Sequence, residues 1–185
     1  MKKLRFLLIL FIGLGVALSS QPTQARVKIP ANFRLVIPTI GVNLPVGEAH
    51  FYSNTWYIPQ VTNRVEHLQG RPLPGQNNNV PIAAHIDLGR TRPGPFFNLK
   101  VLKVGDPIQV VYGGTIYEYS VQQTSVVAPT DLSSLYTTSS ETLTLITCAG
   151  TLLRTGYTQR LIVRAVLVDS KPVPTPVKSP AKSHS

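Results

Sequence analysis

Two β-forming runs near the C-terminus constrain the fold most strongly. Residues 143–148 alternate aliphatic and β-branched side chains and end at the only cysteine, and residues 160–168 form a second run that begins with an arginine. The connection between them has a glycine near each end, so the runs are predicted to pair as antiparallel strands. The end of the first strand then lies beside the start of the second, about 4.8 Å away between strand axes. This pairing places Cys148 and Arg160 at one edge of a sheet.

Short β-forming runs separated by turn residues account for most of the remaining chain. Strands are predicted over residues 33–37, 42–46, 80–85, 107–112 and 115–121, the last two joined by a Gly-Gly turn. Residues 47–79 are predicted to be rich in loops, with Trp56 and Tyr57 as core anchors. Residues 96–99 are predicted to form a helical turn that returns Phe96 and Phe97 to the core. Roughly eight short strands without a layer of helices predict an all-β fold, a closed or nearly closed β-barrel.

The two ends of the chain differ in composition from its middle. Three basic residues precede a thirteen-residue apolar run, 6–18, and small residues follow at 23–25. This pattern predicts a signal peptide over residues 1–25, with a short uncleaved membrane anchor as the alternative. Either segment predicts an exported, extracytoplasmic domain, secreted or attached to the cell membrane. We expect a linker at 26–32, a folded domain at 33–169 and a disordered Pro/Lys/Ser-rich tail at 170–185.

The net charge of +10 raises the possibility of a nucleic-acid partner. All eight acidic residues and ten of the basic ones lie between residues 33 and 169, so the predicted folded domain carries only about +2. The other basic residues lie in the N-terminal segment and in the tail. The charge therefore predicts no basic binding face, and we expect no nucleic-acid partner.

Cys148, His85 and Arg160 have side chains suited to catalysis, and each also has a plain structural interpretation, whereas His50 and His67 lie in the loop-rich stretch without a partner that the sequence indicates. Cys148 is unpaired in a chain predicted to be exported, so it is either a small buried hydrophobe or a reactive thiol. His85 ends a buried strand, where structural histidines are common, and Arg160 is matched by Arg154 and Arg164 as ordinary alternatives. Their combination favours chemistry, because a cysteine and a histidine that are distant in sequence can form a nucleophile and base. A guanidinium nearby can stabilise an oxyanion.

These residues resemble the signature of the sortase family. The segment Thr144-Leu145-Ile146-Thr147-Cys148 followed by Arg160 is similar to the family's active-site strand pair. Three further segments match the family in order: Ala84-His85-Ile86-Asp87, Phe96-Phe97-Asn98-Leu99 and Val104-Gly105-Asp106. Residues 35–46 are similar to the family's first strand and turn. The resemblance covers about residues 33–168.

The resemblance implies an eight-stranded sortase barrel in which the strands of His85 and Cys148 are parallel neighbours. The implied activity is transpeptidation: Cys148 attacks a Thr–Gly-type bond of a sorting signal, and an amine resolves the thioester. His85 would act as acid and base, and Arg160 would orient the substrate and stabilise the oxyanion. The implied partners are surface-protein sorting signals and an amine acceptor, such as a cell-wall precursor or a pilin lysine. No cofactor or metal is expected.

Several features differ from the family pattern. Ala84 replaces the usual glycine before the histidine, and Val65-Glu66-His67-Leu68 stands where several members carry Gly-Trp-Tyr. The loop before the Cys148 strand is short, and the smaller E- or F-like groups are the closest expected subclass. Two other functions remain as alternatives: a secreted thiol peptidase that releases the acyl group to water, and a catalytically inactive wall-binding barrel.

Overall fold

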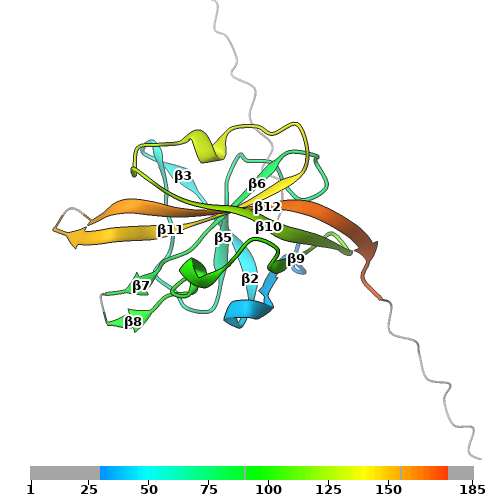
Figure 1. Ribbon diagram of the computed structural model, residues 1–185, viewed down its shortest axis with the longest axis horizontal. Helices are drawn as coiled ribbons and strands as arrows, with labels where there is room; N and C mark the ends of the chain where they lie inside the picture. Colours follow the sequence, from blue (N-terminus) through cyan, green and yellow to red (C-terminus); the bar gives the residue numbers. More distant parts are fainter. Residues whose placement is uncertain (1–29, 90, 155, 175–185) are drawn as a thin grey trace, which may run out of the picture.

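A computed structural model describes residues 30–174 of the chain, except residues 90 and 155. The barrel strands are β1 (Arg34–Ile37), β2 (Val42–Ala49), β5 (Val65–Leu68), β6 (Asn79–Ala83), β9 (Pro107–Tyr112), β10 (Thr115–Val127), β11 (Thr142–Leu153) and β12 (Gly156–Pro172). They close in the order β1-β2-β5-β6-β11-β12-β10-β9 (Figure 1). This confirms the predicted all-β, eight-stranded closed barrel.

Smaller elements lie outside the eight strands of the barrel. Two short hairpins are formed by β3 (Phe51–Tyr52) with β4 (Thr55–Trp56) and by β7 (Asp87–Leu88) with β8 (Arg92–Pro93). The 3-10 helices are η1 (Pro38–Ile40), η2 (Leu99–Val101) and η3 (Ser133–Leu135). In Figure 1, β3 and the segment that carries η3 lie on one side of the β11–β12 ribbon, and β7 and β8 lie on the other. Different elements therefore lie on the two sides of the β11–β12 ribbon.

Two strand pairings place the predicted catalytic residues together. β6 and β11 are parallel neighbours, with Ala83 opposite Ile146, as the family resemblance implied. β11 and β12 are antiparallel, and Cys148 lies opposite Arg160, as the sequence pattern predicted. The parallel pairing explains why residues 80–84 are almost continuously apolar, since central parallel strands are buried on both faces.

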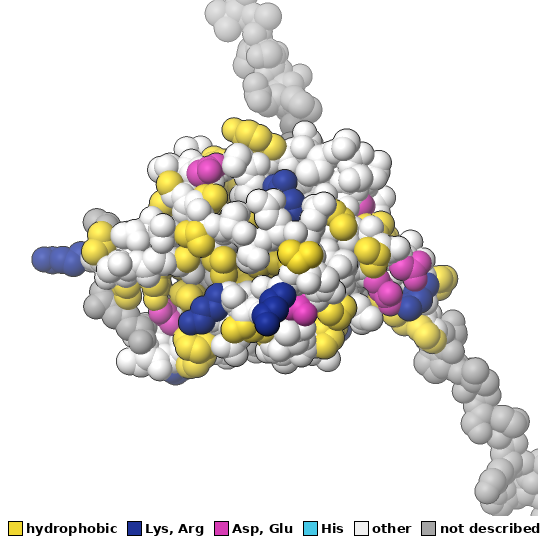
Figure 2. Space-filling model, viewed as in Figure 1, with side chains coloured by type: hydrophobic (Ala, Val, Ile, Leu, Met, Phe, Trp, Pro, Cys, Tyr) yellow, Lys and Arg dark blue, Asp and Glu magenta, His cyan; other side chains and the backbone are white. Residues whose placement is uncertain are grey.

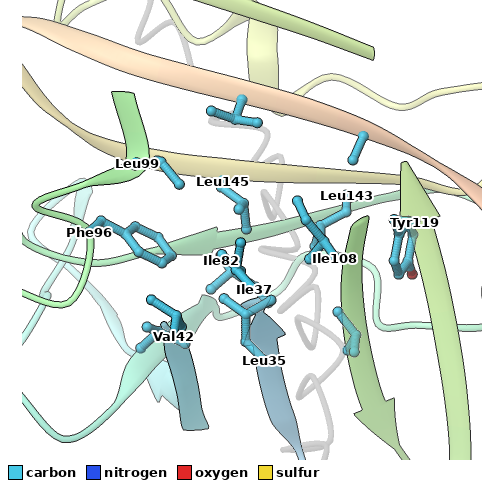
Figure 3. Packing of buried hydrophobic residues seen from close by; sticks show 14 of the residues in the cluster. Leu35, Ile37, Val42, Ile82, Phe96, Leu99, Ile108, Tyr119, Leu143 and Leu145 are labelled. Atoms are coloured by element: carbon cyan, nitrogen blue, oxygen red, sulfur yellow. The ribbon is translucent and has the colours of Figure 1, made fainter. Parts of the chain in front are cut away.

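Alternation along β11 separates a core face from a site face. Leu143 and Leu145 are fully buried and point into the barrel, where they pack with Ile82, Ile108 and Tyr119 (Figure 3). Each fully buried aliphatic side chain contributes about 1.5–3 kcal/mol of transfer free energy. Residues of the other parity point outward, because successive side chains on a strand alternate faces. Cys148 is therefore on the outer face of the barrel wall.

The structure corrects several of the predicted strands. Residues 65–68 form β5 inside the stretch predicted as loop. β6 ends at Ala83, so His85 lies two residues beyond the strand that was predicted to contain it. β11 and β12 continue past Cys148 and Arg160 to a tight hairpin, so residues 149–159 are mostly strand. β12 also runs to Pro172, three residues past the expected domain boundary.

Three aromatic side chains are more exposed than predicted. Tyr57 is 67% exposed and Phe97 is 43% exposed, so only Phe96 of the predicted Phe-Phe pair returns to the core. Trp56 is half-buried and lies outside the barrel, against Phe51 and beneath the guanidinium of Arg71. The chain at residues 55–58 crosses the outside of the barrel, which explains why its aromatic rings do not reach the interior.

Charged side chains on the face shown in Figure 2 are scattered, and no single basic patch gathers on it. In the part of the chain that the structure describes, no helix is long and apolar enough to cross a bilayer. The apolar run 6–18 and residues 175–185 of the predicted tail lie outside the described residues.

Candidate active site

A cavity of about 390 Å³ lies on the outer face of the barrel, above β6 and β11. His85, Cys148 and Arg160 all line it. Most of its other lining residues are apolar and come from residues 55–58, from the segment before and within η3, and from β5, β6, β11 and β12. They include Trp56, Ile58, Leu68, Ala83, Leu132, Leu135, Ile146 and Ile162. The three residues predicted to carry chemistry thus meet at one apolar groove.

Cys148 is half-buried on the outer face of β11. Burial raises the pKa of its thiol above the ordinary value, because a thiolate loses solvation in this position. The charge of Arg160 lowers the same pKa, and the charge of Asp87 raises it. In the described part of the chain no hydrogen bond joins the thiol to His85. The thiol is therefore mostly protonated at neutral pH, and its activation requires a base.

His85 is oriented by the backbone of the cavity wall. Its Nε2 lies 3.0 Å from the carbonyl oxygen of Ile58. A carbonyl oxygen only accepts hydrogen bonds, so Nε2 donates and carries the ring hydrogen. In the neutral ring Nδ1 then carries the lone pair that can take a proton. Thr147 also ties this region to β11, because its hydroxyl donates to the carbonyl oxygen of Ala84 at 2.8 Å.

Arg160 lies directly across from Cys148 on β12. Directly opposed residues have Cβ atoms about 4.5–5.5 Å apart and share a face of the sheet. One nitrogen, Nη1, donates to the carbonyl oxygens of Tyr157 and Gln159 at 3.3 and 2.9 Å. Among the described residues, Nε and Nη2 of Arg160 have no hydrogen-bond acceptor. These donors remain available for a substrate carbonyl or an oxyanion.

The other arginines considered from the sequence lie elsewhere. Arg154 sits at the tip of the β11–β12 hairpin, just beyond the end of β11. Arg164 lies opposite Thr144 and donates to the carbonyl oxygen of Ser134 at 3.3 Å, so it holds η3 against the barrel. Arg71 also reaches the η3 segment, through the carbonyl oxygen of Leu135 at 3.3 Å. Arg164 and Arg71 therefore shape a wall of the cavity.

The remaining histidines of the described chain do not line the cavity. His67 is buried inside the barrel, with Nε2 2.9 Å from the carbonyl oxygen of Pro72, and burial lowers its pKa. His50 lies 3.5 Å from Glu48 on the surface. In the described residues no group of three His, Cys, Asp or Glu side chains is arranged to hold a metal ion.

Two residues that connect with Arg160 or His85 were not singled out from the sequence. Asp87 follows His85 by two residues on β7, and its Oδ2 accepts a hydrogen bond from the hydroxyl of Tyr157 on β12. The backbone carbonyl of Tyr157 in turn accepts the hydrogen bond from Arg160. Only the position of Asp87 just after the histidine signalled its proximity, whereas the role of the Ile58 carbonyl, a backbone group, left no mark in the sequence.

Comparisons with known proteins agree with this geometry. The sortase domain model matches residues 35–168. No curated protein sequence matches the chain significantly.

Several solved structures share the fold. A lid mutant of sortase A from Corynebacterium diphtheriae is 30% identical, with a TM-score of 0.61, covering 80% of this chain and 74% of that one. Sortase C-1 from Actinomyces oris is 32% identical, with a TM-score of 0.60, covering 74% and 73%. A sortase D5 transpeptidase of Clostridium perfringens is 27% identical, with a TM-score of 0.61, covering 77% and 82%.

These structures carry three different class letters, so the match is to the sortase fold as a whole rather than to one class. The family model spans well over half of the chain and includes the strands of Cys148 and Arg160. The chain therefore belongs to the sortase family, and it is a sortase-type transpeptidase.

Proposed function

We propose that this sortase domain acts outside the cytoplasm, where it cleaves a sorting-signal peptide and transfers the acyl part to an amine. Cys148 is the proposed nucleophile, His85 the acid and base, and Arg160 the oxyanion and substrate ligand. The observation that carries the proposal is that these three residues, from separate segments of the chain, line one apolar cavity.

The proposed reaction begins with the transfer of the thiol proton of Cys148 to Nδ1 of His85. The sulfur attacks the carbonyl carbon of the scissile peptide bond, and the charge that develops on the oxygen is met by the unused donors of Arg160. His85 returns the proton to the leaving amine, which leaves a thioester on Cys148. The acceptor amine then attacks the thioester, the carbon–sulfur bond breaks, and a new peptide bond forms.

The groove supports a peptide substrate with apolar residues before the scissile bond. Its walls carry aromatic and aliphatic side chains, and within the described residues Asp131 is the only acidic one that lines it. An apolar groove with a few convergent polar groups is the usual form of a binding site for such a ligand. The export of the domain is proposed from the basic and apolar N-terminal pattern.

The acyl-enzyme is the direct test of the mechanism. Incubation with a pool of Thr–Gly peptides should add one acyl group to Cys148, detected by intact-protein mass spectrometry. Cys148→Ala should abolish both the adduct and turnover, while the loss of one sulfur should cost only about 1–2 kcal/mol of stability. Substantial turnover by the alanine variant would exclude Cys148 as the nucleophile.

Product analysis separates a transpeptidase from a thiol peptidase on the same barrel. With an added primary amine, a transpeptidase yields the amide, whereas a peptidase yields the carboxylic acid whether or not the amine is present. A catalytically inactive wall-binding module would yield neither product, and alkylation of Cys148 would leave its binding intact.

A further inference from the structure

The wall of the cavity that contains η3 is not part of the barrel sheet. Leu132, Ser134 and Leu135 of this wall line the cavity, and the segment connects β10 to β11. A short helix leaves its last carbonyl oxygens without partners inside the helix. In η3 these are the carbonyl oxygens of Ser134, Leu135 and Tyr136, because the helix's own hydrogen bonds end on Leu132 and Ser133. Groups outside the helix must therefore hold this end of the wall.

Asn79 provides two of these hydrogen bonds from β6. Its side chain shares the outer face of β6 with Ala83, which lines the cavity, and only 2% of the residue is exposed. Its Nδ2 donates to the carbonyl oxygen of Ser134 at 2.8 Å and to that of Tyr136 at 3.0 Å. An amide nitrogen carries two hydrogens, so both of its donors are used on the wall.

Thr144 holds the other end of the Asn79 amide. Its hydroxyl donates to Oδ1 of Asn79 at 2.6 Å, and the residue is fully buried. Thr144 shares a face of β11 with Cys148, and four residues of strand, about 13 Å, separate the two. These hydrogen bonds therefore join the wall to the strand of the nucleophile, while Asn79 stays away from the thiol.

Two arginines reach the same wall through longer hydrogen bonds. Arg164 donates to the carbonyl oxygen of Ser134 and Arg71 to that of Leu135, each at 3.3 Å. Both arginines are only half-buried, so water competes for their guanidinium groups, whereas the amide of Asn79 is buried. A hydrogen bond that is shielded from water is electrostatically stronger. Asn79 is therefore the principal attachment of the wall.

We propose that Asn79, held by Thr144, is a positioning residue for the peptide: it keeps the η3 wall in its peptide-binding position before any peptide arrives. Asn79 does not itself line the cavity, so it acts through Ser134 and Leu135. The proposal rests on the proposed acyl transfer and concerns its first substrate, the peptide that acylates Cys148.

The expected effect is on affinity rather than on chemistry. A wall released from Asn79 occupies several positions, and the peptide binds only the molecules in which the wall is in place. The apparent affinity falls by the fraction of such molecules, so a wall that is in place one tenth of the time weakens binding about tenfold. A saturating peptide selects the ordered wall, and kcat is then restored.

Steady-state kinetics test this separation of KM from kcat. The probe is the member of a pool of Thr–Gly peptides that the natural sequence turns over fastest. Asn79→Ala should raise KM about tenfold and should leave kcat within about twofold. Ile108→Val is the control for a loss of stability alone, because Ile108 is buried inside the barrel, away from the wall (Figure 3). It should lower Tm and leave KM unchanged.

Hydrogen exchange tests the position of the wall without any turnover. The variant Cys148→Ala, which cannot form a thioester, is compared with Cys148→Ala/Asn79→Ala. Mass spectrometry should show faster amide exchange over residues 131–137 in the double variant. A saturating concentration of the same peptide should return this exchange to the slower rate, because bound peptide holds the wall from the other side.

Thr144→Val provides a second variant if Asn79→Ala does not fold. It keeps a similar side-chain shape and removes the hydroxyl that holds Oδ1 of Asn79. We expect a rise in KM that is smaller than that of Asn79→Ala, since both hydrogen bonds from Nδ2 remain. The combination with Asn79→Ala should add nothing further, because Thr144 acts through Asn79. Fully additive effects would contradict this link.

The possible failures are distinguishable. A fall in kcat at unchanged KM in Asn79→Ala, or unchanged exchange over residues 131–137, would overturn the positioning role while acyl transfer stands. The absence of turnover of every peptide by the natural sequence would instead refute the proposed acyl transfer. The exchange of the peptide-free variants would then still show whether Asn79 holds the wall.

Discussion

At Cys148, burial and two opposite charges compete to set the acidity of the thiol. Burial is the strongest influence and raises the pKa, Asp87 adds to the rise, and Arg160 opposes it. A raised pKa means that the reactive thiolate becomes abundant only as the pH increases above the ordinary range for cysteine. In the free enzyme the thiol should therefore be protonated and weakly reactive, and the bound substrate and His85 should activate it together.

The first prediction concerns the rate at which iodoacetamide alkylates Cys148. This rate should rise with pH, with a midpoint above that of a free cysteine. Arg160→Gln removes the stabilising positive charge and should shift the midpoint to higher pH, whereas Asp87→Asn removes a negative charge and should shift it to lower pH. Stopped-flow or mass-spectrometric measurement of the rate checks both directions. Equal shifts in the two variants would contradict these charge assignments.

A second prediction concerns His85, whose Nε2–H is committed to the carbonyl of Ile58. If Nδ1 exchanges the proton, kcat/KM should be bell-shaped in pH, with one limb from each group of the coupled pair. His85→Ala should reduce kcat by about 10²–10⁴-fold and should leave peptide binding largely intact. His67→Gln is the control, because that histidine is buried away from the cavity. A flat profile across the neutral range would count against the pair.

Strand pairing explains why the sequence correctly predicted that Cys148 lies beside Arg160. The register that sets Cys148 against Arg160 follows from two alternating runs and a short connection, and both are local features. β5 was missed for a different reason: all four of its residues are buried, yet two of them, Glu66 and His67, are polar. A strand that is buried on both faces does not show the alternation of apolar and polar residues by which a half-buried strand is recognised in a sequence.

The length of the β11–β12 hairpin was also missed. Gly150 and Gly156 mark positive-φ positions and were interpreted as the ends of a loop. Gly150 instead sits where β11 carries one extra residue, between the pairs Ala149–Gln159 and Leu152–Tyr157. A side chain at Gly150 would meet the hydroxyl of Thr158 at 2.5 Å. A β-bulge adds one unpaired residue to one strand and increases the local twist. The pairing of β11 with β12 therefore continues beyond Gly150, and Cys148 stays opposite Arg160.

The third prediction tests that register. Arg160→Lys should reduce turnover about tenfold or more, because lysine replaces a planar fork of donors with a single point charge. Arg154→Lys is the matched control and should stay near the natural rate, because Arg154 lies six residues beyond Cys148, roughly 20 Å along the ribbon. Parallel kinetics on the two variants measure the difference. A large loss of turnover in Arg154→Lys would show that the β11–β12 hairpin folds differently in solution.

At the scale of the whole molecule, buried polar groups join the barrel wall to the loops around it. Glu141 accepts hydrogen bonds from the backbone amides of Gly75 and Asn77, both at 2.8 Å, and from the hydroxyl of Tyr119 at 2.9 Å. The three donors come from the loop before β6 and from β10. One carboxylate therefore joins a loop and a strand that are distant in sequence, and only the tertiary fold reveals this contact.

Glu66 is a second buried carboxylate, and it is less well satisfied. It is 1% exposed, Arg64 donates to its Oε1 at 2.6 Å, and its Oε2 has no hydrogen-bond partner among the described residues. Burial is the strongest influence and raises its pKa, against the opposing charge of Arg64. A buried acceptor without a donor costs about 1–3 kcal/mol, so burial favours the neutral acid more in the folded state than in the unfolded chain.

The fourth prediction follows from that raised pKa. Between the ordinary pKa of glutamate and the raised folded value, the folded chain binds more protons than the unfolded chain, so Glu66 makes the free energy of unfolding fall as the pH rises. Glu66→Gln should remove this component and should be more stable than the natural sequence above the folded pKa. Urea denaturation across the acidic and neutral range gives the difference between the two curves. The opposite slope expected from His67, whose pKa is lowered, is common to both and cancels. If the difference does not grow with pH, Arg64 keeps Glu66 charged throughout, and the ion pair rather than burial determines its state.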